Sequence, residues 1–233
     1  MNLLSVSVSM GKEVPYQGKT VATGIFKQSV DGRVMLRTLN LNGDKQIDRK
    51  GHGGIYKAVC VYTIENYEHW KRELGRDDFK IPQFGENFTV EGMLEEDIHV
   101  GDVFRIGGAV VEVTQPRVPC FRLGIKMNNP KFPRLFLRSC RVGFYFRVLE
   151  EGEVGPGDTI EYVRKDPEEM TVHEICHLYY YDPNNLKACE RAVRIAALSP
   201  GWREGFMDRL EKAGIPVERR DEPEDALCCG PEN

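Results

Sequence analysis

The distribution of apolar residues divides the chain into a long strand-rich part and a shorter helical part. Up to about residue 163, short runs of β-branched and aromatic residues recur, and Gly, Asp and Asn separate them. This pattern predicts strands at 3–8, 21–25, 33–36, 58–62, 88–90, 103–106, 109–113, 143–149 and 159–163, with one helix at 64–74. Many short strands at this spacing favour a closed or nearly closed β-barrel, because closure removes exposed sheet edges.

Helical spacing of apolar residues begins after residue 171. Thr171 and Glu174 are spaced as a capping box, and the apolar residues that follow recur with the helical period. Asp182-Pro183-Asn184 is expected to end this first helix and to cap a second at 185–197, and Ser199-Pro200 predicts the start of a third. The predicted fold is mainly β: a barrel at 1–165, a three-helix subdomain at 171–214 and a disordered acidic tail at 215–233.

Composition sets broad limits on the class of protein. Apolar residues make up 41% of the chain and charged residues 29%, which is ordinary for a globular protein. A net charge of −4 gives no overall attraction to nucleic acid or to an anionic membrane, and no apolar run reaches transmembrane length. The first residues lack the basic and apolar regions of a signal peptide. Seven cysteines without a framework spacing predict reduced thiols and a cytoplasmic location, and the adjacent Cys228-Cys229 is interpreted as part of the loose tail.

Cys120 stands in a constrained and positively charged setting, directly after a predicted strand. Pro116 and Pro119 fix the backbone just before the thiol. Arg117 and Arg122 place positive charge beside it, which favours thiolate over thiol. A rigidly held cysteine of this kind is suited to bind a soft metal or to act as a nucleophile. The alternative interpretation is a small buried hydrophobe in a proline-rich turn.

A glycine-rich segment at 48–57 is a candidate anion site. Its glycines surround His52 and let backbone N–H groups approach a ligand closely. The basic residues of the segment are Arg49, Lys50 and Lys57. The segment is not a Walker motif, and the alternative interpretation is a glycine-rich turn with solvated charges.

Gly85-Glu86-Asn87, directly before a predicted strand, is a second polar motif. The side chains of Glu86 and Asn87 are able to hydrogen-bond the edge of a polar heterocycle. The same residues also commonly cap turns, so the alternative is a structural role at the start of the strand.

His173-Glu174-Ile175-Cys176-His177 fits the H-E-x-x-H pattern, which places two histidines on one face of a helix. A zinc hydrolase is therefore a rival interpretation. Against it, the predicted helix is short, Glu174 already serves the capping box, and no glycine- and histidine-bearing extension follows to supply a third ligand. The alternative to a zinc site is a pair of partly exposed helix histidines, with Cys176 facing the core.

Short motifs occur in a specific order along nearly the whole chain. They are Thr23-Gly24-Ile25-Phe26-Lys27, Gly43-Asp44, His52-Gly53-Gly54, Lys57-Ala58-Val59, Gly85-Glu86-Asn87 with Gly92, Gly101-Asp102, Thr114-Gln115-Pro116-Arg117 with Cys120, Tyr145 with Arg147-Val148-Leu149 and Gly152, Gly157-Asp158, and in the helical part Thr171-Val172, Leu198-Ser199 and Trp202-Arg203. On these motifs the chain resembles the MOSC proteins, which are named for the C-terminal domain of molybdenum cofactor sulfurase. Within them it resembles the YiiM-type group, which carries a three-helix subdomain.

The resemblance implies a β-barrel that binds molybdenum cofactor, a pterin dithiolene with a phosphate group. The family's metal-ligating cysteine falls on Cys120, and a thiolate suits this soft centre. The candidates for contacts with the cofactor phosphate are Lys27, Arg49, His52, Lys57 and Arg117, together with the backbone of Gly53 and Gly54. The candidates for contacts with the pterin edge are Glu86 and Asn87.

The resemblance further implies reduction of N-hydroxylated compounds, including N-hydroxylated purine bases, to the amine, which is a detoxification. The reaction takes two electrons and two protons and releases water, and His52 is a candidate proton donor. The chain has neither a dinucleotide-binding fingerprint nor iron–sulfur cysteine spacing, so we expect a separate flavin- or ferredoxin-type reductase to supply electrons. The three-helix subdomain is a candidate surface for this partner or for a homodimer. The alternative is a protein that carries the cofactor or sulfur without catalysis.

Overall fold

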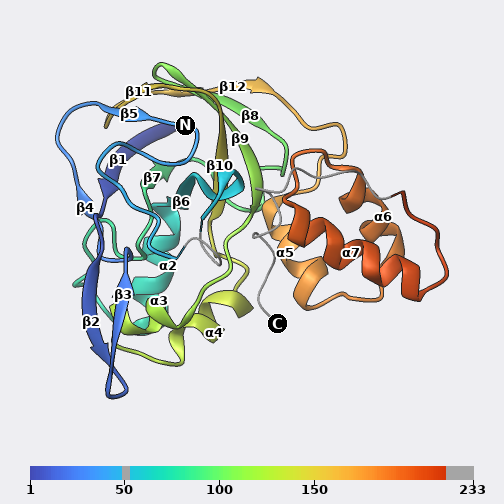
Figure 1. Ribbon diagram of the computed structural model, residues 1–233, viewed down its shortest axis with the longest axis horizontal. Coiled ribbons are helices and arrows are strands. Elements are labelled where there is room, and N and C mark those ends of the chain that lie inside the picture. The colour runs from blue at the N-terminus through green and yellow to red at the C-terminus, as the bar shows by residue number, and fades with distance from the viewer. Residues whose placement is uncertain (49–52, 219–233) are drawn as a thin grey trace.

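A curved eight-stranded sheet is the largest element of the computed structural model, which describes residues 1–48 and 53–218 (Figure 1). In spatial order its strands are β12 (Ile160–Arg164), β8 (Val103–Ile106), β9 (Ala109–Pro116), β10 (Phe144–Glu150), β6 (Val59–Thr63), β7 (Phe88–Glu91), β1 (Asn2–Val8) and β4 (Gln28–Ser29). Neighbouring strands are antiparallel, except that β6 and β7 are parallel. Two further antiparallel pairs are β2 (Lys12–Tyr16) with β3 (Lys19–Thr23), and β5 (Val34–Leu36) with β11 (Gly152–Val154). The mainly β prediction is confirmed.

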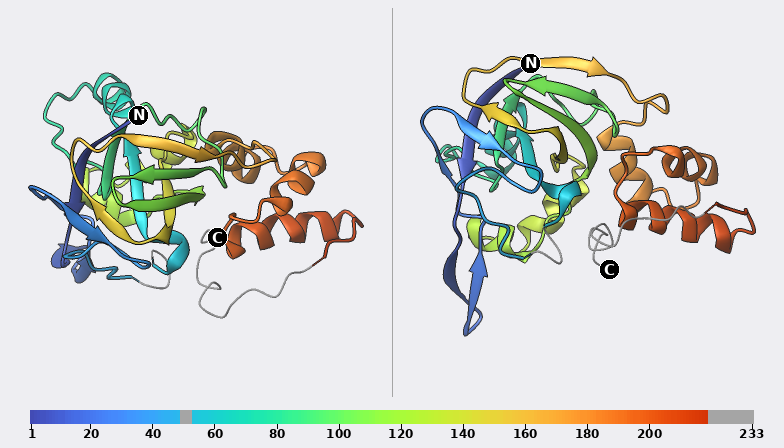
Figure 2. Two further views of the ribbon diagram at one scale, coloured as in Figure 1. Left: turned by 90° about the horizontal axis from the view of Figure 1, so that it is seen from above. Right: turned by 45° about the horizontal axis from the view of Figure 1, so that its top comes forward.

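The predicted closure into a barrel is not confirmed. The hydrogen-bonded strand order runs from β12 to β4 and does not return on itself. The two sides of the sheet nevertheless approach each other, because Leu3 N donates to Asp158 O at 2.9 Å and Ile160 N donates to Met1 O at 3.0 Å. Figure 2 shows the resulting curvature of the strands around the interior.

Six α-helices and one short 3₁₀-helix complete the described chain. They are η1 (Ile55–Lys57), α2 (Glu65–Leu74), α3 (Phe121–Lys126), α4 (Phe132–Arg138), α5 (Val172–Tyr180), α6 (Leu186–Arg194) and α7 (Pro200–Lys212). Helix α2 and the last three helices were predicted from sequence, whereas α3 and α4 were not. Among the described residues, no helix is both long and apolar enough to cross a membrane.

The interior contains two hydrophobic clusters. One fills the concave side of the sheet and continues into the last three helices, where Ile175 and Trp202 are fully buried. The other is largely aromatic and lies among α2, α3 and α4, with Trp70 at its centre. The Trp70 ring lies 4.9 Å from the Phe132 ring and 5.6 Å from the Phe136 ring, measured between centroids. This packing gives the short helices α3 and α4 a stability that their length alone does not provide.

The start of the helical region forms as its sequence predicts, with one correction. Thr171 Oγ1 accepts from Glu174 N at 3.0 Å and Thr171 N donates to a Glu174 carboxylate oxygen at 2.8 Å, so the predicted capping box is confirmed. The expected cap of the second helix at Asp182-Pro183-Asn184 is wrong. Asn185 fills that position instead, because its side-chain oxygen accepts from Ala188 N at 3.2 Å.

The predicted disordered tail falls mostly beyond the described residues. Ile215 and Val217, at its start, pack against the core of the helical region. Cys228-Cys229 lies outside the described residues, as does the rest of the tail from position 219.

A buried carboxylate joins α2 to the turn before β10. Glu95 is 1% exposed, and both of its oxygens accept from Asn66 Nδ2 at 2.9 Å. One oxygen also accepts from Gly143 N at 2.7 Å. Burial is the largest influence on this group and raises the pKa of Glu95 to about 7 from its ordinary 4.5.

We predict that Glu95 makes stability fall as pH rises from about 4.5 to 7. In this window the folded protein retains a proton that the unfolded chain releases, so the free energy of unfolding decreases by up to about 3 kcal/mol. Glu95→Gln removes this slope, and urea unfolding at pH 5 and pH 8 measures it. The matched control is Glu96→Gln, since that neighbouring side chain is 42% exposed. Equal pH slopes in wild type and Glu95→Gln contradict the prediction.

Candidate functional site

A cleft lies where strands β6, β9 and β10 meet the loop after β3 and the turn before β7. It encloses about 720 Å³, including the open space at its mouth. The cavity volume within it is about 110 Å³, which is below the roughly 300–1,000 Å³ of typical small-molecule sites. The residues of the cleft wall with charged, polar or thiol side chains include Lys27, Asp44, Lys57, Cys60, Asn87, Arg117, Cys120, Arg122 and Tyr145.

Cys120 lines this cleft at the junction between β9 and α3. The strand ends at Pro116, and Cys120 occupies the N-cap position of α3 with an extended backbone. Its carbonyl accepts from Leu123 N at 3.0 Å. The predicted position of the thiol just beyond a strand is therefore confirmed, and the cysteine is partly exposed rather than a closed-in core residue.

Helix α3 is fixed against the loops of the cleft by a partly buried cation, Lys126, that the sequence interpretation missed. Lys126 Nζ donates to Ile25 O at 3.0 Å and also donates to Pro82 O. Burial lowers the pKa of Lys126 to about 8 from 10.5. The two carbonyls hold the end of α3, and through it they fix the position of Cys120 at the other end.

Arg117 is a buried cation in the cleft wall with an incomplete set of partners. Its side chain is 7% exposed, and Nη2 donates to Phe84 O at 2.8 Å. The guanidinium carbon lies 5.7 Å from the centre of the Phe136 ring. The other terminal nitrogen, Nη1, has no hydrogen-bond partner among the described residues. A buried donor without a partner is costly, so this atom marks a position for a ligand acceptor.

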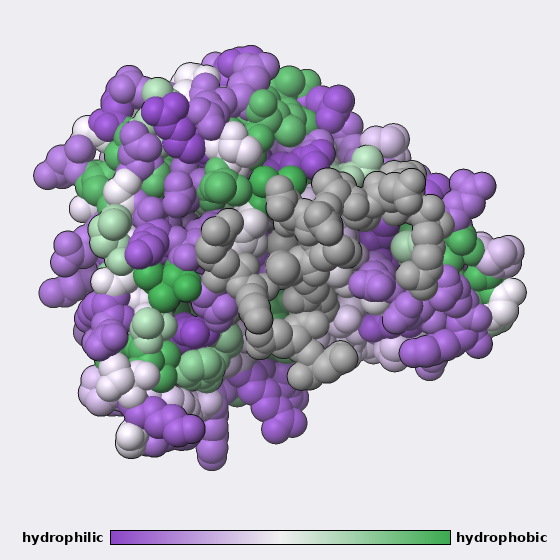
Figure 3. Space-filling model, in the orientation of Figure 1, coloured by the Kyte–Doolittle hydropathy of each residue, from purple (hydrophilic) through white to green (hydrophobic). Residues whose placement is uncertain are grey.

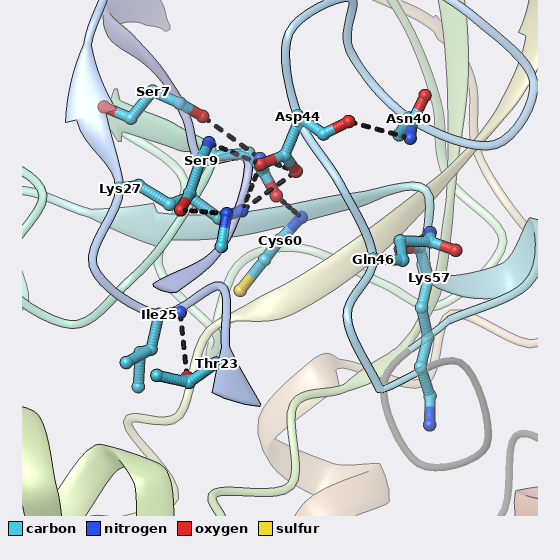
Figure 4. Close-up of polar contacts among 12 residues, drawn as sticks. Ser7, Ser9, Thr23, Ile25, Lys27, Asn40, Asp44, Gln46, Lys57 and Cys60 are labelled. Atoms are coloured by element: carbon cyan, nitrogen blue, oxygen red, sulfur yellow. Dashed lines mark hydrogen bonds and ion pairs between the residues drawn. The ribbon is translucent and has the colours of Figure 1, made fainter. Parts of the chain in front are cut away.

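The predicted phosphate contact Lys27 lines the cleft, but an acidic neighbour neutralises it. Lys27 Nζ lies 2.7 Å and 2.9 Å from the two oxygens of Asp44, and these side chains are 9% and 4% exposed (Figure 4). Asp44 also accepts from Ser9 N at 2.7 Å. Lys57 is 6% exposed and also lines the cleft, and Figure 4 shows its side chain apart from this pair.

The Gly85-Glu86-Asn87 motif holds one wall of the cleft in place. Gly85 has a φ of +83°, and a Cβ there would lie 2.9 Å from Ile25 O, so the motif needs glycine for this close approach. Asn87 Nδ2 donates to Ser7 O at 3.1 Å and to Asp44 at 2.9 Å, while its oxygen accepts from Cys60 N at 3.1 Å. The Asn87 amide therefore holds the Lys27–Asp44 pair in place.

Glu86 does not line the cleft, although it was predicted to read the pterin edge. It is fully buried and accepts hydrogen bonds from Tyr67 Oη, from Phe84 N at 3.1 Å and from Thr89 Oγ1 at 3.0 Å. The Glu86 carboxylate therefore receives hydrogen bonds from donors within the protein.

Other residues predicted for cofactor binding lie elsewhere. Gly53 and Gly54 are not part of the described cleft wall, and Gly54 N donates to the Gln46 side chain at 3.1 Å. Arg49 and His52 fall outside the described residues. Their predicted roles therefore remain predictions.

Cys60 and Tyr145 are cleft residues that sequence reasoning missed. They lie directly opposite each other on β6 and β10, so their side chains share one face of the sheet. Each is 7% exposed. Burial raises the pKa of the Cys60 thiol, and the charge of Arg117 opposes this effect. A cysteine inside an apolar strand gives no local signal of a site, because only the strand register places it in the cleft.

The rival zinc motif has no third ligand in the described part of the chain. The rings of His173 and His177 are stacked on α5 with centroids 6.2 Å apart, and Glu174 is held by the capping box. Within residues 1–48 and 53–218, no group of three potential metal-ligating side chains includes them.

Comparison with known proteins places this fold and cleft in a family. Residues 48–161 match the MOSC domain, and residues 170–213 match the YiiM-like 3-alpha helix domain. The protein YflK of Bacillus subtilis (strain 168) is 41% identical over 217 residues, which cover 93% of this chain and 97% of YflK. The chain therefore belongs to the MOSC family. Within that family it carries the helical domain of the YiiM-like proteins.

Two other relatives bear on structure and activity. The crystal structure of YiiM from Geobacillus stearothermophilus matches with a TM-score of 0.75 and 33% identity, over 90% of this chain and 98% of that chain. A protein of Gibberella moniliformis named Reductase is 32% identical over 151 residues, which are 64% of this chain and 27% of that protein. The first likeness extends over both parts of the fold, and the second covers only a part of the larger fungal protein.

We predict that Asp44→Asn destabilises the protein by about 3 kcal/mol, because it leaves the Lys27 charge buried without its counter-ion. Urea unfolding at neutral pH measures the loss. The control is Arg37→Gln, which breaks an ion pair with Glu151 whose side chains are 50% and 39% exposed. That change costs less than about 1 kcal/mol. Equal effects of the two substitutions contradict the structural role of the buried pair.

Proposed function

We propose that this protein is a molybdenum-cofactor-dependent reductase that converts N-hydroxylated compounds, such as N-hydroxylated purine bases, to the amine. One observation carries the proposal: the Cys120 thiol shares a cleft with the buried Arg117 guanidinium, whose Nη1 has no partner among the described residues. Membership in the MOSC family supports the cofactor. The similarity to a protein named Reductase supports an oxidoreductase.

The donor set of the cleft suits this cofactor. A thiolate such as that of Cys120 is a soft ligand and matches a molybdenum centre that also carries dithiolene sulfurs. The phosphate at the other end needs charged donors, and arginine pairs with phosphate through two parallel N–H groups. We assign the phosphate to Arg117 rather than to Lys27, since Asp44 already compensates the charge of Lys27.

The reaction divides the work between cofactor and chain. When bound, the cofactor supplies two-electron redox chemistry at its metal. The Cys120 sulfur holds the metal, and Arg117 orients the anionic end. Conversion of the N–OH group to N–H and water also consumes two protons. Cys60 and Tyr145 hold exchangeable protons inside the cleft, and the raised pKa keeps Cys60 a neutral thiol near pH 7.

The source of electrons is part of the proposal. The described part of the chain contains no helix or strand arrangement that we assign to a flavin or nicotinamide, and the sequence has no fingerprint for either. We therefore propose that a separate protein of the flavin or ferredoxin type delivers the electrons. The substrate is a small N-hydroxylated molecule that enters through the mouth of the cleft.

We predict that Cys120→Ala lowers both bound molybdenum and turnover by more than about 100-fold, because it removes the ligand that holds the metal. The protein is produced in a host that makes the cofactor. Metal analysis gives the molybdenum content, and reduction of an N-hydroxylated purine base with dithionite and methyl viologen gives the rate. The control is Cys189→Ala, which removes a buried thiol on α6.

The wild-type measurements distinguish the proposal from its alternative. Bound molybdenum with turnover supports the reductase, whereas bound molybdenum without turnover supports a carrier of cofactor or sulfur. Full activity of a folded Cys120→Ala protein contradicts the assigned role of the thiol.

Replacing Arg117 tests the phosphate assignment separately. We expect Arg117→Gln to reduce cofactor retention by roughly 10- to 100-fold, since hydrogen bonds to charged groups contribute about 1.5–3 kcal/mol. Arg117→Lys keeps the charge but loses the planar pair of donors, so its retention lies between those of wild type and Arg117→Gln. Phosphorus and molybdenum content after gel filtration measure retention. Wild-type retention in folded Arg117→Gln is the contrary result.

A further inference from the structure

The hairpin of β2 and β3 stands outside the eight-stranded sheet and projects beside α3 (Figures 1 and 2). Its two strands pair from Lys12–Thr23 to Tyr16–Lys19. Gln17 and Gly18 form its tight turn, with φ of 49° and 74°. The hairpin brings Tyr16 to the outer side of the cleft, next to the segment that carries Cys120.

An aromatic stack joins the hairpin to α3. The Tyr16 and Phe121 rings are stacked with their centroids 5.4 Å apart. Phe121 directly follows Cys120 in the chain and is 42% exposed. The guanidinium carbon of Arg122 lies 4.9 Å from the centre of the Phe121 ring. The residue next to the cleft thiol therefore lies on the outer surface, within a group of aromatic and cationic side chains.

The surface continues along the base of the hairpin. Lys12 Nζ lies 3.8 Å from the centre of the Phe26 ring, and Met10 is 66% exposed. We call the surface formed by Met10, Lys12, Tyr16, Phe26, Phe121 and Arg122 the hairpin rim. On the face drawn in Figure 3, hydrophobic side chains interrupt the polar surface on the side where β2 and β3 lie. Aromatic residues, methionine and arginine are the types enriched at protein–protein contacts.

The hairpin rim is locally positive although the chain is acidic overall. Residues 10–23 contain Lys12 and Lys19 but one carboxylate, Glu13, while Arg122 is paired with Asp48 at 3.0 Å and adds no net charge. Lys45, which is exposed, adds charge at the adjoining edge of the cleft. The whole chain has a net charge of −4. A positive patch attracts partners of negative charge and repels the same patch on another copy of the chain.

We propose that the hairpin rim is the docking surface for a small acidic electron-transfer protein that carries a flavin or an iron–sulfur cluster. This inference rests on the proposed function. Docking there brings the donor's redox group close to Cys120, because Phe121 is its neighbour in the chain, and electron transfer weakens steeply with distance. Two reduced donor molecules each lose one electron, and the N–OH compound gains these two electrons and two protons to give the amine and water.

The rim favours this donor over two other arrangements. A second copy of the chain would have to place one positive rim against another under two-fold symmetry. The second alternative is docking of the donor at the helical region, which lies on the other side of the molecule from the hairpin (Figure 1). Electron-transfer contacts are small and steered by charge, which matches a rim built from one hairpin and the start of one helix.

The test compares two electron sources for the same holoenzyme. One is dithionite with methyl viologen, which needs no docking surface. The other is a purified acidic [2Fe–2S] ferredoxin or flavodoxin, kept reduced by NADPH and its reductase. The variants are Lys12→Glu, which reverses one rim charge, and Tyr16→Ser, which removes the stack. The control is Lys187→Glu, an exposed charge reversal on α6.

We expect Lys12→Glu and Tyr16→Ser each to lower kcat/KM for the protein donor by about 10-fold at low ionic strength. Dithionite-driven turnover of all the variants, and the protein-donor kcat/KM of Lys187→Glu, remain at the wild-type level. The Lys12→Glu defect shrinks with added salt, whereas the Tyr16→Ser defect does not.

Several outcomes overturn the inference. These are equal protein-donor rates in the rim variants and wild type, a larger loss in Lys187→Glu, or wild-type turnover with dithionite but with neither acidic protein. Absence of turnover with dithionite in the molybdenum-loaded wild type instead contradicts the proposed function, and the inference with it.

Discussion

The buried charge of Arg117 is the constraint on which the cleft depends. Removing a guanidinium from water costs several kcal/mol, and the protein offsets only part of this. Phe84 O accepts one hydrogen bond, the ring of Phe136 faces the charge, and the backbone N–H of Arg117 donates to Gly143 O at 3.0 Å. Nη1 lacks a partner among the described residues, and in the proposed function the cofactor phosphate supplies one.

The same bonds connect the cleft to the stability of the fold. Gly143 receives Arg117 N on its carbonyl, and its own N–H donates to the buried carboxylate of Glu95. Gly143 also has a φ of +72°, and a Cβ there would lie 2.3 Å from Val61 O, so no other residue fits the turn. Gly143 therefore links the Glu95 carboxylate to the backbone of Arg117 through two hydrogen bonds.

The sequence predicted most of the sheet but not the elements that depend on tertiary packing. Strand β8 was predicted at its observed bounds, and the other main strands were predicted within a few residues, because apolar and β-branched runs are local signals. Helices α3 and α4 were missed, since they are short and prolines flank them. What stabilises them is the burial of Phe132 and Phe136 against Trp70, which no local pattern reveals.

The candidate site likewise contains residues that local sequence signals identified and residues whose partners only the tertiary structure reveals. Cys120 and Arg117 were found because the Pro-Arg-x-Pro-Cys run is a local signal, and both line the cleft. Lys27 was expected to be an available cation, but its counter-ion Asp44 lies 17 residues away in the chain. Glu86 was expected to face a ligand, but it faces hydrogen-bond donors inside the protein. Pairings across the fold decide which polar residues remain available to a ligand.

Cys120 and Phe121 show how one short segment serves two surfaces. Successive residues at the start of a helix point in directions about 100° apart, so neighbours at the first turn of α3 do not share a face. Cys120 therefore lines the cleft while Phe121 lies in the hairpin rim, stacked on Tyr16. In the proposed reductase, substrate enters the cleft and electrons enter through the rim. The two routes meet at the peptide unit between Cys120 and Phe121. A bound substrate and a docked electron donor therefore do not compete for the same surface.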